Sequence, residues 1–315
     1  MKRLSNIFLA AVVILLGMSS CQKESQNAEP VGKKENVTIA IQSPDMLTTK
    51  TIGDGTKAKA VYYTAFVGDL QIQDLKGKLE LIDGNATLNV PLVKNVHYDF
   101  VFWAQYEAEG VASPYDISTF YEDAKVTVSY DGPANDDYRD AFCAKKDIYV
   151  GMPDNVVTLS RPFAQVNFAA ADYEMVKYLD LHQGMTSETT VLGLPDVLNV
   201  RYGTVSVSDA SAAGITAKFT PAAIPSGYDE YITIAGEDYG YVNMNYVLAS
   251  EVGETVKVQA KFVNGTSKWE TKMVENVPVC RNHKTNIFGN IFSEDATLHI
   301  VVDPLFKKPD TNKEL

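Results

Sequence analysis

The chain has 315 residues, of which 45% are hydrophobic and 22% charged, so its composition is that of a globular protein and excludes a disordered one. It carries 40 acidic and 28 basic residues, a net charge of −12, which argues against nucleic acid or anionic headgroups as main partners. The length is sufficient for two domains of ordinary size or for one large β-domain.

The first 20 residues have the parts of a secretory signal. Lys2 and Arg3 form a basic start, an apolar run follows, and Ser19 and Ser20 precede Cys21. The apolar core is too short to cross a hydrocarbon layer of about 30 Å as a helix. Small residues that end on a cysteine resemble a bacterial lipobox, so we expect a lipoprotein signal peptide over 1–20 and acylation of Cys21. The alternative is an ordinary secretory signal cut nearby, with Cys21 incidental.

Residues 21–35 are polar and predict a flexible tether. Residues 36–42 alternate apolar and polar side chains, with Val37, Ile39 and Ile41 on one face, and predict the first strand. A long polar loop follows over 43–59, and loops of this length in compact domains are functional or mobile.

Short segments rich in Val, Tyr, Phe and Thr continue the period of two, so we predict an all-β protein, a sandwich or barrel. Asp83-Gly84-Asn85 predicts a hairpin, and residues 108–123 predict an irregular stretch with a short helix. The strands expected in this first half are 61–67, 78–82, 86–90, 98–105, 125–130 and 156–160.

The second half reads as another β-rich unit with one helix, and we place the boundary near Ser160, giving domains 36–160 and 161–315. The helix is expected over 172–183, with Asp172 as its cap and Met175, Tyr178, Leu179 and His182 on its apolar face. Asn264-Gly265 predicts a hairpin. The strands expected here are 161–169, 197–202, 204–207, 231–235, 239–249, 255–262, 268–274 and 297–303.

The sequence gives no reason to expect an enzyme, a metal or a cofactor. His97, His182, His283 and His299 form no i, i+4 metal pair and have no zinc-ligand spacing to a cysteine. A phosphate loop and a nucleophile elbow are also missing from the sequence. The acidic segment 131–140 lacks the spacing of a calcium loop, and a solvated turn is the favoured interpretation.

Two further residue pairs carry alternatives. Trp103 and Trp269 could offer a surface on which sugars stack, although aromatic residues of β-sandwiches more often lie in the core. Cys143 and Cys280 could form a disulfide in an exported protein, but two cysteines make no disulfide framework, and unpaired thiols are favoured.

Three motifs resemble those of one family. Residues 138–146 (YRDAFCAKK) with 161–168 (RPFAQVNF), and residues 281–292 (RNHKTNIFGNIF) with the strand after them, are similar to segments of fimbrillin-like lipoproteins of gut and oral anaerobes. Lys23-Glu24 after Cys21 resembles the surface-export tag of such lipoproteins.

This resemblance implies two tandem transthyretin-like β-sandwich domains, no catalytic activity, and a place on the outer membrane and in a type V pilus. In stalk subunits of the family, a trypsin-like protease removes the N-terminal segment with the first strand. A strand of a neighbouring subunit then fills the groove. The expected partners are therefore other pilus subunits, the outer membrane through lipid, and host or bacterial surface ligands.

Carried onto this chain, the resemblance points to Lys50 as the processing residue, with Lys57 and Lys59 as rivals. The family often uses arginine, which the loop lacks. The expected donor strand is residues 297–306, with Leu298, Ile300 and Val302 on one face. We therefore predict a pilus subunit or pilus-associated adhesin that assembles by donor-strand addition. The alternative function is a surface glycan-binding lipoprotein. The alternative to strand exchange is that both end strands pair within their own chain.

Overall fold

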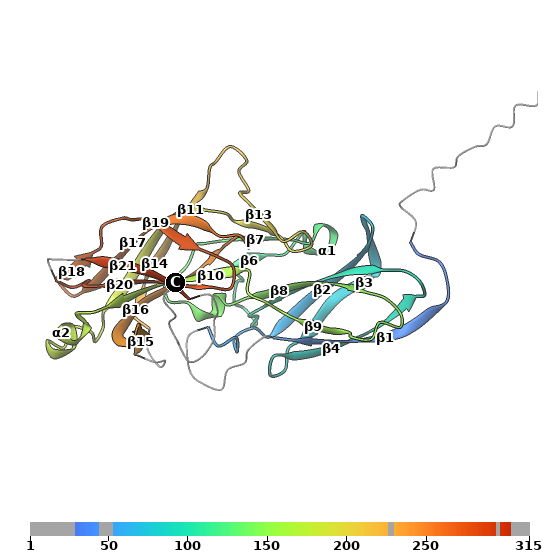
Figure 1. The fold of residues 1–315 in the computed structure, drawn as a ribbon, viewed down its shortest axis with the longest axis horizontal. Coiled ribbons are helices and arrows are strands. Elements are labelled where there is room, and N and C mark those ends of the chain that lie inside the picture. The colour runs from blue at the N-terminus through green and yellow to red at the C-terminus, as the bar shows by residue number, and fades with distance from the viewer. Residues whose placement is uncertain (1–28, 44–52, 226–229, 294–296, 304–315) are drawn as a thin grey trace, which may run out of the picture.

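The protein is almost entirely β-structure, as predicted. The computed structural model describes residues 29–43, 53–225, 230–293 and 297–303. Its helical elements within those ranges are α1 (Phe120–Asp123), α2 (Tyr173–Tyr178) and a 3-10 helix (Asp137–Arg139). Figure 1 shows an elongated molecule, with most strands of the first half at one end and those of the second half at the other.

Two sheets pack at the N-terminal end. One has three strands in the order β4-β1-β9, and the other has four in the order β3-β2-β5-β8. Between them lies a hydrophobic cluster, here called the N-terminal cluster, which includes Ile39, Leu88 and Phe100. The strands are β1 (Lys34–Gln42), β2 (Ala60–Val67), β3 (Leu70–Glu80), β4 (Asn85–Val93), β5 (Tyr98–Gln105), β8 (Phe142–Ile148) and β9 (Val156–Thr158).

The sheet β3-β2-β5-β8 has apolar residues on both faces. Along β5, Phe100 and Phe102 belong to the N-terminal cluster, whereas Val101 and Trp103 belong to a second and larger one, here called the C-terminal cluster. Successive side chains of a strand point to opposite faces, so this strand is buried on both sides and reads as a continuous apolar run. The sheet is thus a layer shared by both cores.

Two larger sheets form the C-terminal end. One has the order β15-β16-β10-β20-β21, with β10 and β20 parallel; the other has the order β14-β11-β17-β18, and β19 also pairs with β17. The strands are β10 (Phe163–Ala170), β11 (Thr186–Leu194), β14 (Ile215–Ala223), β15 (Tyr231–Ile234), β16 (Glu237–Leu248), β17 (Glu254–Asn264), β18 (Ser267–Glu270), β19 (Val274–Val279), β20 (Lys284–Gly289) and β21 (Leu298–Asp303).

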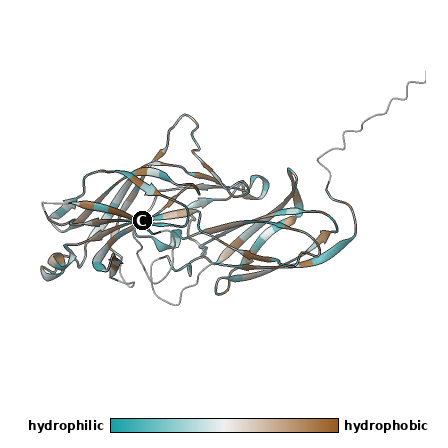
Figure 2. Cartoon of the chain, in the orientation of Figure 1, coloured by the Kyte–Doolittle hydropathy of each residue, from teal (hydrophilic) through white to brown (hydrophobic). Residues whose placement is uncertain are grey.

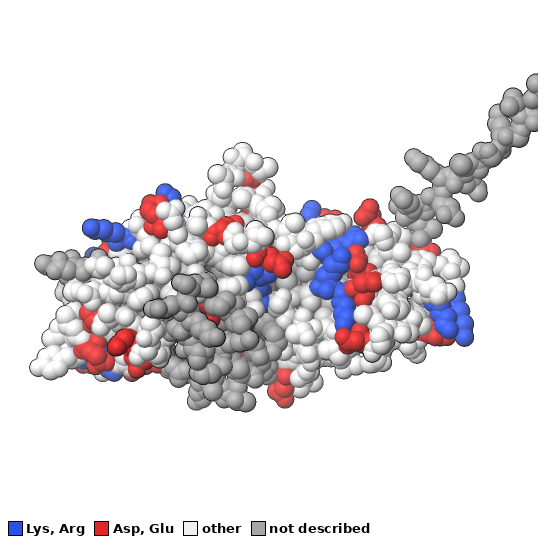
Figure 3. Space-filling view, viewed as in Figure 1, with Lys and Arg blue, Asp and Glu red and all other residues white. Residues whose placement is uncertain are grey.

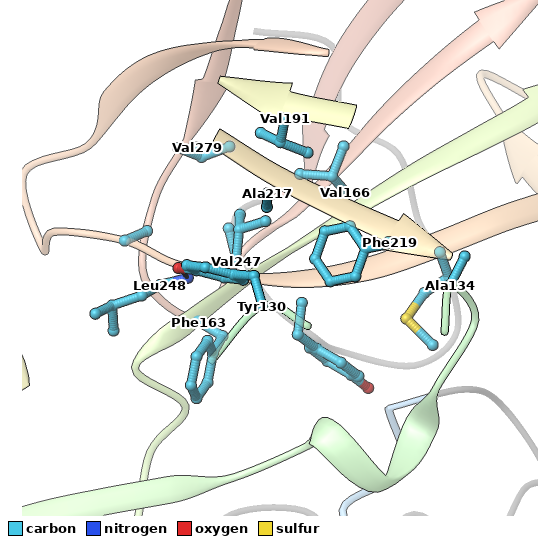
Figure 4. Packing of buried hydrophobic residues seen from close by; sticks show 14 of the residues in the cluster. Tyr130, Ala134, Phe163, Val166, Val191, Ala217, Phe219, Val247, Leu248 and Val279 are labelled. Atoms are coloured by element: carbon cyan, nitrogen blue, oxygen red, sulfur yellow. Dashed lines mark hydrogen bonds between the residues drawn. The ribbon is translucent and has the colours of Figure 1, made fainter. Parts of the chain in front are cut away.

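The C-terminal cluster fills the space between these sheets. Figure 4 shows the rings of Tyr130, Phe163 and Phe219 meeting aliphatic side chains from several strands. The buried Tyr130 hydroxyl donates to the Pro195 carbonyl and accepts from the Leu248 amide, so this polar group is satisfied within the core.

A small sheet joins the two halves of the chain. Its order is β13-β12-β7-β6, so strands from the first half pair with strands from the second. It consists of β6 (Tyr115–Asp116), β7 (Lys125–Val128), β12 (Val197–Asn199) and β13 (Thr204–Ser206). The division near Ser160 stays a prediction, since both this sheet and the shared layer cross it.

Both predicted turns are present, with different consequences. Asn264 and Gly265 lead directly from β17 into its antiparallel partner β18, as expected of a hairpin. Asp83 and Gly84 both have positive φ, 46° and 72°, but the strands on either side enter different sheets, β3 in one and β4 in the other. This turn therefore connects the two layers of the sandwich and makes no hairpin ladder.

The predicted helix is shorter than expected and faces the other way. α2 ends at Tyr178, and its buried residues are Tyr173 and Val176, whereas Tyr178 is 90% exposed. The Asp172 side chain makes no cap; it accepts hydrogen bonds from the amides of Ile291 and Phe292. The helix is thus placed by contacts distant in sequence, which local periodicity cannot report.

Hydropathy alternates along the strands, and the surface carries charges of both signs. Figure 2 shows hydrophobic and hydrophilic residues alternating along many of the strands. Figure 3 shows basic and acidic side chains side by side over the half that holds β2, β3, β5 and β8. Ion pairs there include Lys145 with Asp99, and Lys146 with Asp154, at 3.2 and 3.3 Å. Pairs of this exposed kind contribute little stability, so the hydrophobic clusters dominate.

Candidate functional site

The first strand of the described chain lies in the middle of its sheet. β1 pairs antiparallel with β4 over nine residue pairs and parallel with β9 over three. Val37, Ile39 and Ile41 are at most 5% exposed and form part of the N-terminal cluster. Full burial of one such side chain stabilises a fold by roughly 1.5–3 kcal/mol, so β1 is a large part of this sandwich.

Loss of β1 would leave a defined groove. The edges of β4 and β9 would both carry unpaired backbone N–H and C=O groups, and the cluster around Leu88, Val90 and Val157 would be open to water. Such a site satisfies its hydrogen bonds and its apolar surface together only by accepting another strand.

The last described strand has the opposite character. Among the described strands, β21 lies at the edge of its sheet and pairs only with β20, over six residue pairs. Leu298 and Val301 pack partly against the C-terminal cluster, while Ile300 is 37% exposed. Of the predicted donor face, Leu298 and Val302 are half-buried and Ile300 faces solvent. The strand is held mainly by backbone hydrogen bonds on one side.

The basic residues after β1 fall into two groups. Lys50 lies outside the described residues, as does the predicted lipid-attachment residue Cys21 before β1. Lys57 and Lys59 lie in a segment that contacts the rest of the fold. The Lys59 amide donates to the Gln105 carbonyl at 2.9 Å, and the Lys57 ammonium lies 5.3 Å from the centre of the Tyr138 ring.

A buried polar network fixes the chain at Gly53. Arg161 is 2% exposed, and its Nε and Nη2 donate to the two carboxylate oxygens of Asp140 at 2.7 and 2.8 Å. The Arg161 Nη2 also donates to the Gly53 carbonyl at 2.5 Å. The Gly53 amide donates to Asp137 Oδ1 at 2.9 Å, which also accepts from the Tyr246 hydroxyl at 2.9 Å. We call Gly53, Asp137, Asp140, Arg161 and Tyr246 the junction network.

This network corrects one prediction and shows what sequence reasoning missed. The segment 131–140 was expected to be a solvated turn, but Asp137 and Asp140 are 5% and 1% exposed. Burial, together with the charge of Asp140, raises the pKa of Asp137 to about 6. The partners Gly53 and Arg161 are 108 residues apart in the sequence. The one signal in the sequence was Arg161 itself, a charged residue directly before Pro162 and an apolar strand.

The two tryptophans differ in how deeply they are buried. Trp103 is fully buried, its ring centre 5.2 Å from that of Tyr115, and its Nε1 donates to Gln105 at 2.8 Å. A stacking site needs an exposed ring face, so Trp103 cannot supply one, and the favoured interpretation, a core position, holds for this residue. Trp269 is half-buried with its ring edge against Phe292.

The cysteines, histidines and helices add no site. Cys143 and Cys280 are free thiols, the first buried and the second half-buried. His97 pairs with Asp147 on the surface at 2.7 Å. Within the described ranges the side chains of His, Cys, Asp and Glu form no group of three that could hold a metal ion. In the same part of the chain, no helix has the length and apolar character needed to cross a membrane.

The fold and the site together define an all-β protein with a core-filling first strand and a weakly held edge strand near its other end. Solved structures that the chain resembles include a "putative cell adhesion protein" from Bacteroides uniformis, 14% identical, with a TM-score of 0.48 over 85% of this chain and 97% of that one. The tip fimbrial protein Mfa3 from Porphyromonas gingivalis is 10% identical, with a TM-score of 0.44 over 85% of this chain and 99% of that one.

A fimbrial assembly protein from Parabacteroides distasonis is 10% identical, with a TM-score of 0.43 over 86% of this chain and 96% of that one. No curated protein sequence matches the chain. The model of the family of unknown function DUF6562 matches residues 70–315, and the chain belongs to this family.

Proposed function

We propose that the protein is a cell-surface lipoprotein of the fimbrillin type, a pilus subunit or pilus-associated adhesin without chemistry of its own. The observation that carries the proposal is the position of β1 between β4 and β9, with Val37, Ile39 and Ile41 in the core. A strand placed in this way can be replaced only by another strand, which is the requirement for donor-strand addition.

The two terminal strands fit the two halves of such an exchange. β1 fills a groove, and β21 pairs along one side only, with partly exposed apolar side chains. A strand of this second kind loses few contacts when it leaves its own sheet. In the proposal, residues 297–306 of one subunit, with Leu298, Ile300 and Val302 as anchors, enter the groove of the next.

Processing would occur after Lys50, in the loop that follows β1. The junction network supports this choice over Lys57 and Lys59, because it anchors the backbone at Gly53 and the segment after it is bonded. Proteases need an extended and locally unfolded substrate. In the proposal Cys21 carries the lipid, so one cut would release the anchor and open the groove.

The experiment uses purified chain trimmed with trypsin, mixed with a synthetic peptide of residues 297–306. We expect heat-resistant complexes of the trimmed chain with the peptide, and polymers without it. The matched control is the same peptide with Leu298, Ile300 and Val302 replaced by Asp, which should not bind. A trimmed chain that stays folded and monomeric, and binds neither peptide, would contradict the proposal.

A further inference from the structure

A cavity of about 520 Å³ lies beside the shared sheet and belongs to none of the features above. The loop after β5, at residues 106–114, forms one wall, and Asp136 and Tyr138 beside the 3-10 helix form another. Its volume is within the roughly 300–1,000 Å³ of small-molecule sites. We call it the tyrosine pocket, after Tyr62, Tyr106, Tyr115 and Tyr138, which line it.

Two tyrosine rings give the tyrosine pocket an apolar surface. The ring centres of Tyr106 and Tyr138 are 4.4 Å apart, and their planes are inclined by 50°. Tyr138 is 49% exposed, whereas most aromatic rings of this protein are buried. An exposed ring beside a cavity provides a flat apolar face for the C–H groups of a ligand.

One buried polar side chain in the tyrosine pocket has spare hydrogen-bonding capacity. Gln105 is 3% exposed, and its Oε1 accepts from Trp103 Nε1 at 2.8 Å, which fixes the orientation of the amide. The Gln105 amide nitrogen donates to no described residue. This nitrogen is not among the fully buried unpaired polar atoms of the described chain, so it is accessible from the cavity and can donate to a ligand that offers an acceptor.

Asp136 supplies an acceptor to the same cavity. Its Oδ1 accepts from the Tyr138 amide at 3.1 Å, while its Oδ2 is 3.6 Å from Arg139 Nε, beyond ordinary hydrogen-bond distance. The second carboxylate oxygen can therefore accept from a ligand hydroxyl. A donor amide and an acceptor carboxylate beside an aromatic face suit a ligand with several hydroxyl groups.

The charges of the tyrosine pocket are already balanced. Glu107 lies 2.5 Å from Lys78 Nζ and also accepts from the Tyr62 hydroxyl at 3.0 Å. The Lys57 ammonium lies 5.3 Å from the centre of the Tyr138 ring. The positions that a cationic ligand would take are thus filled by the protein's own lysines, and a neutral ligand is favoured.

We propose that the tyrosine pocket binds a neutral sugar ring. The apolar face of the sugar packs on Tyr106 and on the part of the Tyr138 ring that the Lys57 ammonium does not cover, and the sugar hydroxyls bond the Gln105 amide and the Asp136 carboxylate. This site replaces the tryptophan surface that the sequence suggested. It does not depend on strand exchange, because its residues belong to neither terminal strand.

The test is saturation-transfer NMR of the full chain with methyl glycosides of glucose, galactose, mannose and N-acetylglucosamine. We expect saturable binding of at least one of them. Tyr138→Ala should weaken it about tenfold or more, as should Asp136→Asn, which keeps an acceptor for the Tyr138 amide. The matched control is Tyr178→Ala, which removes a tyrosine that is 90% exposed on α2 and should bind as the unaltered chain does.

Three outcomes would overturn the proposal. The first is that no glycoside binds saturably. The second is that Tyr138→Ala and Asp136→Asn, with unchanged melting temperatures, both bind as tightly as the control. The third is that N-acetyl-lysine methylamide, a cationic probe, binds in place of every sugar.

Discussion

At the scale of single residues, the junction network places charged side chains in the interior of the fold. Arg161 and Asp140 are almost fully buried, and a buried charge is tolerated only when it is paired and hydrogen-bonded. Here the pairing is bidentate, and the guanidinium also lies 4.7 Å from the centre of the Phe142 ring. This arrangement makes the network sensitive to the loss of any one partner.

Arg161→Met should therefore strongly destabilise the chain. It leaves the Asp140 carboxylate buried without its cation, and breaking a buried pair in this way costs about 3–5 kcal/mol. The free energy of unfolding from urea titration measures the effect. Lys33→Met is the matched control, because it breaks an exposed pair with Glu35 and should cost about 1 kcal/mol or less. Equal effects of the two substitutions would contradict the assigned role.

Asp137 should give the network a pH dependence. Its pKa is raised from 3.8 to about 6, chiefly by burial. The folded chain therefore binds this proton more tightly than the unfolded chain. The resulting stability is fully present below about pH 4 and is lost as the pH rises through 6.

Relative to Asp137→Asn, which does not titrate, the unaltered chain should lose up to about 3 kcal/mol between pH 4 and pH 7. Urea titrations at both pH values measure this difference. A difference that is independent of pH would show that Asp137 does not titrate as proposed.

At the scale of elements, the terminal strands differ in how they are held. β1 is anchored by core side chains and by two neighbours, whereas β21 has one neighbour and shallow packing. The depth of burial therefore determines how much stability is lost when each strand leaves its sheet: much for β1 and little for β21.

Ile39→Ala should destabilise β1, because it removes a fully buried side chain from the N-terminal cluster. Large-to-small changes of this kind cost about 2–5 kcal/mol. Faster trimming of the N-terminal segment by trypsin should accompany the loss. Thr38→Ala, on the exposed face of the same strand, is the control and should change both quantities little. Equal trimming rates for the two variants would show that β1 is not held by its core face.

Ile300→Asp should separate donor function from stability. Since Ile300 is 37% exposed, the monomer should lose about 1 kcal/mol or less in urea titration. Polymers of the trimmed chain should nevertheless fail to form, because an aspartate cannot enter an apolar groove. Polymers of normal yield would show that another segment is the donor.

The strands that could be predicted are those with apolar alternation. β1 alternates in this way and falls within a few residues of its expected range, and β5, a continuous apolar run, also matches its expected range. β11 was missed because the first two of its inward residues are polar: Ser187 and Thr189 are 1% exposed and bond Asn243 at 2.9 and 2.7 Å. A strand that buries hydrogen-bonded polar side chains leaves no hydrophobic period to read. β8, β14 and β20 also lay outside the predicted strands.

At the scale of the whole molecule, the ranges of the first and last described strands could be predicted from the sequence. The contacts between segments that are distant in the sequence could not. The junction network joins Gly53 to Arg161, and the tyrosine pocket joins Tyr62 to Tyr138. Such sites depend on which strands are neighbours, and periodicity does not specify neighbours. The molecule is therefore built as two linked cores, and the junction network joins segments that are distant in the sequence.

The most direct measurement is the N-terminal residue of the chain in filaments isolated from the cell surface, determined by mass spectrometry. The proposal predicts that the chain begins at Thr51, with β1 and Cys21 absent. Filaments in which the chain still begins at Cys21 and retains β1 would contradict donor-strand assembly through this groove.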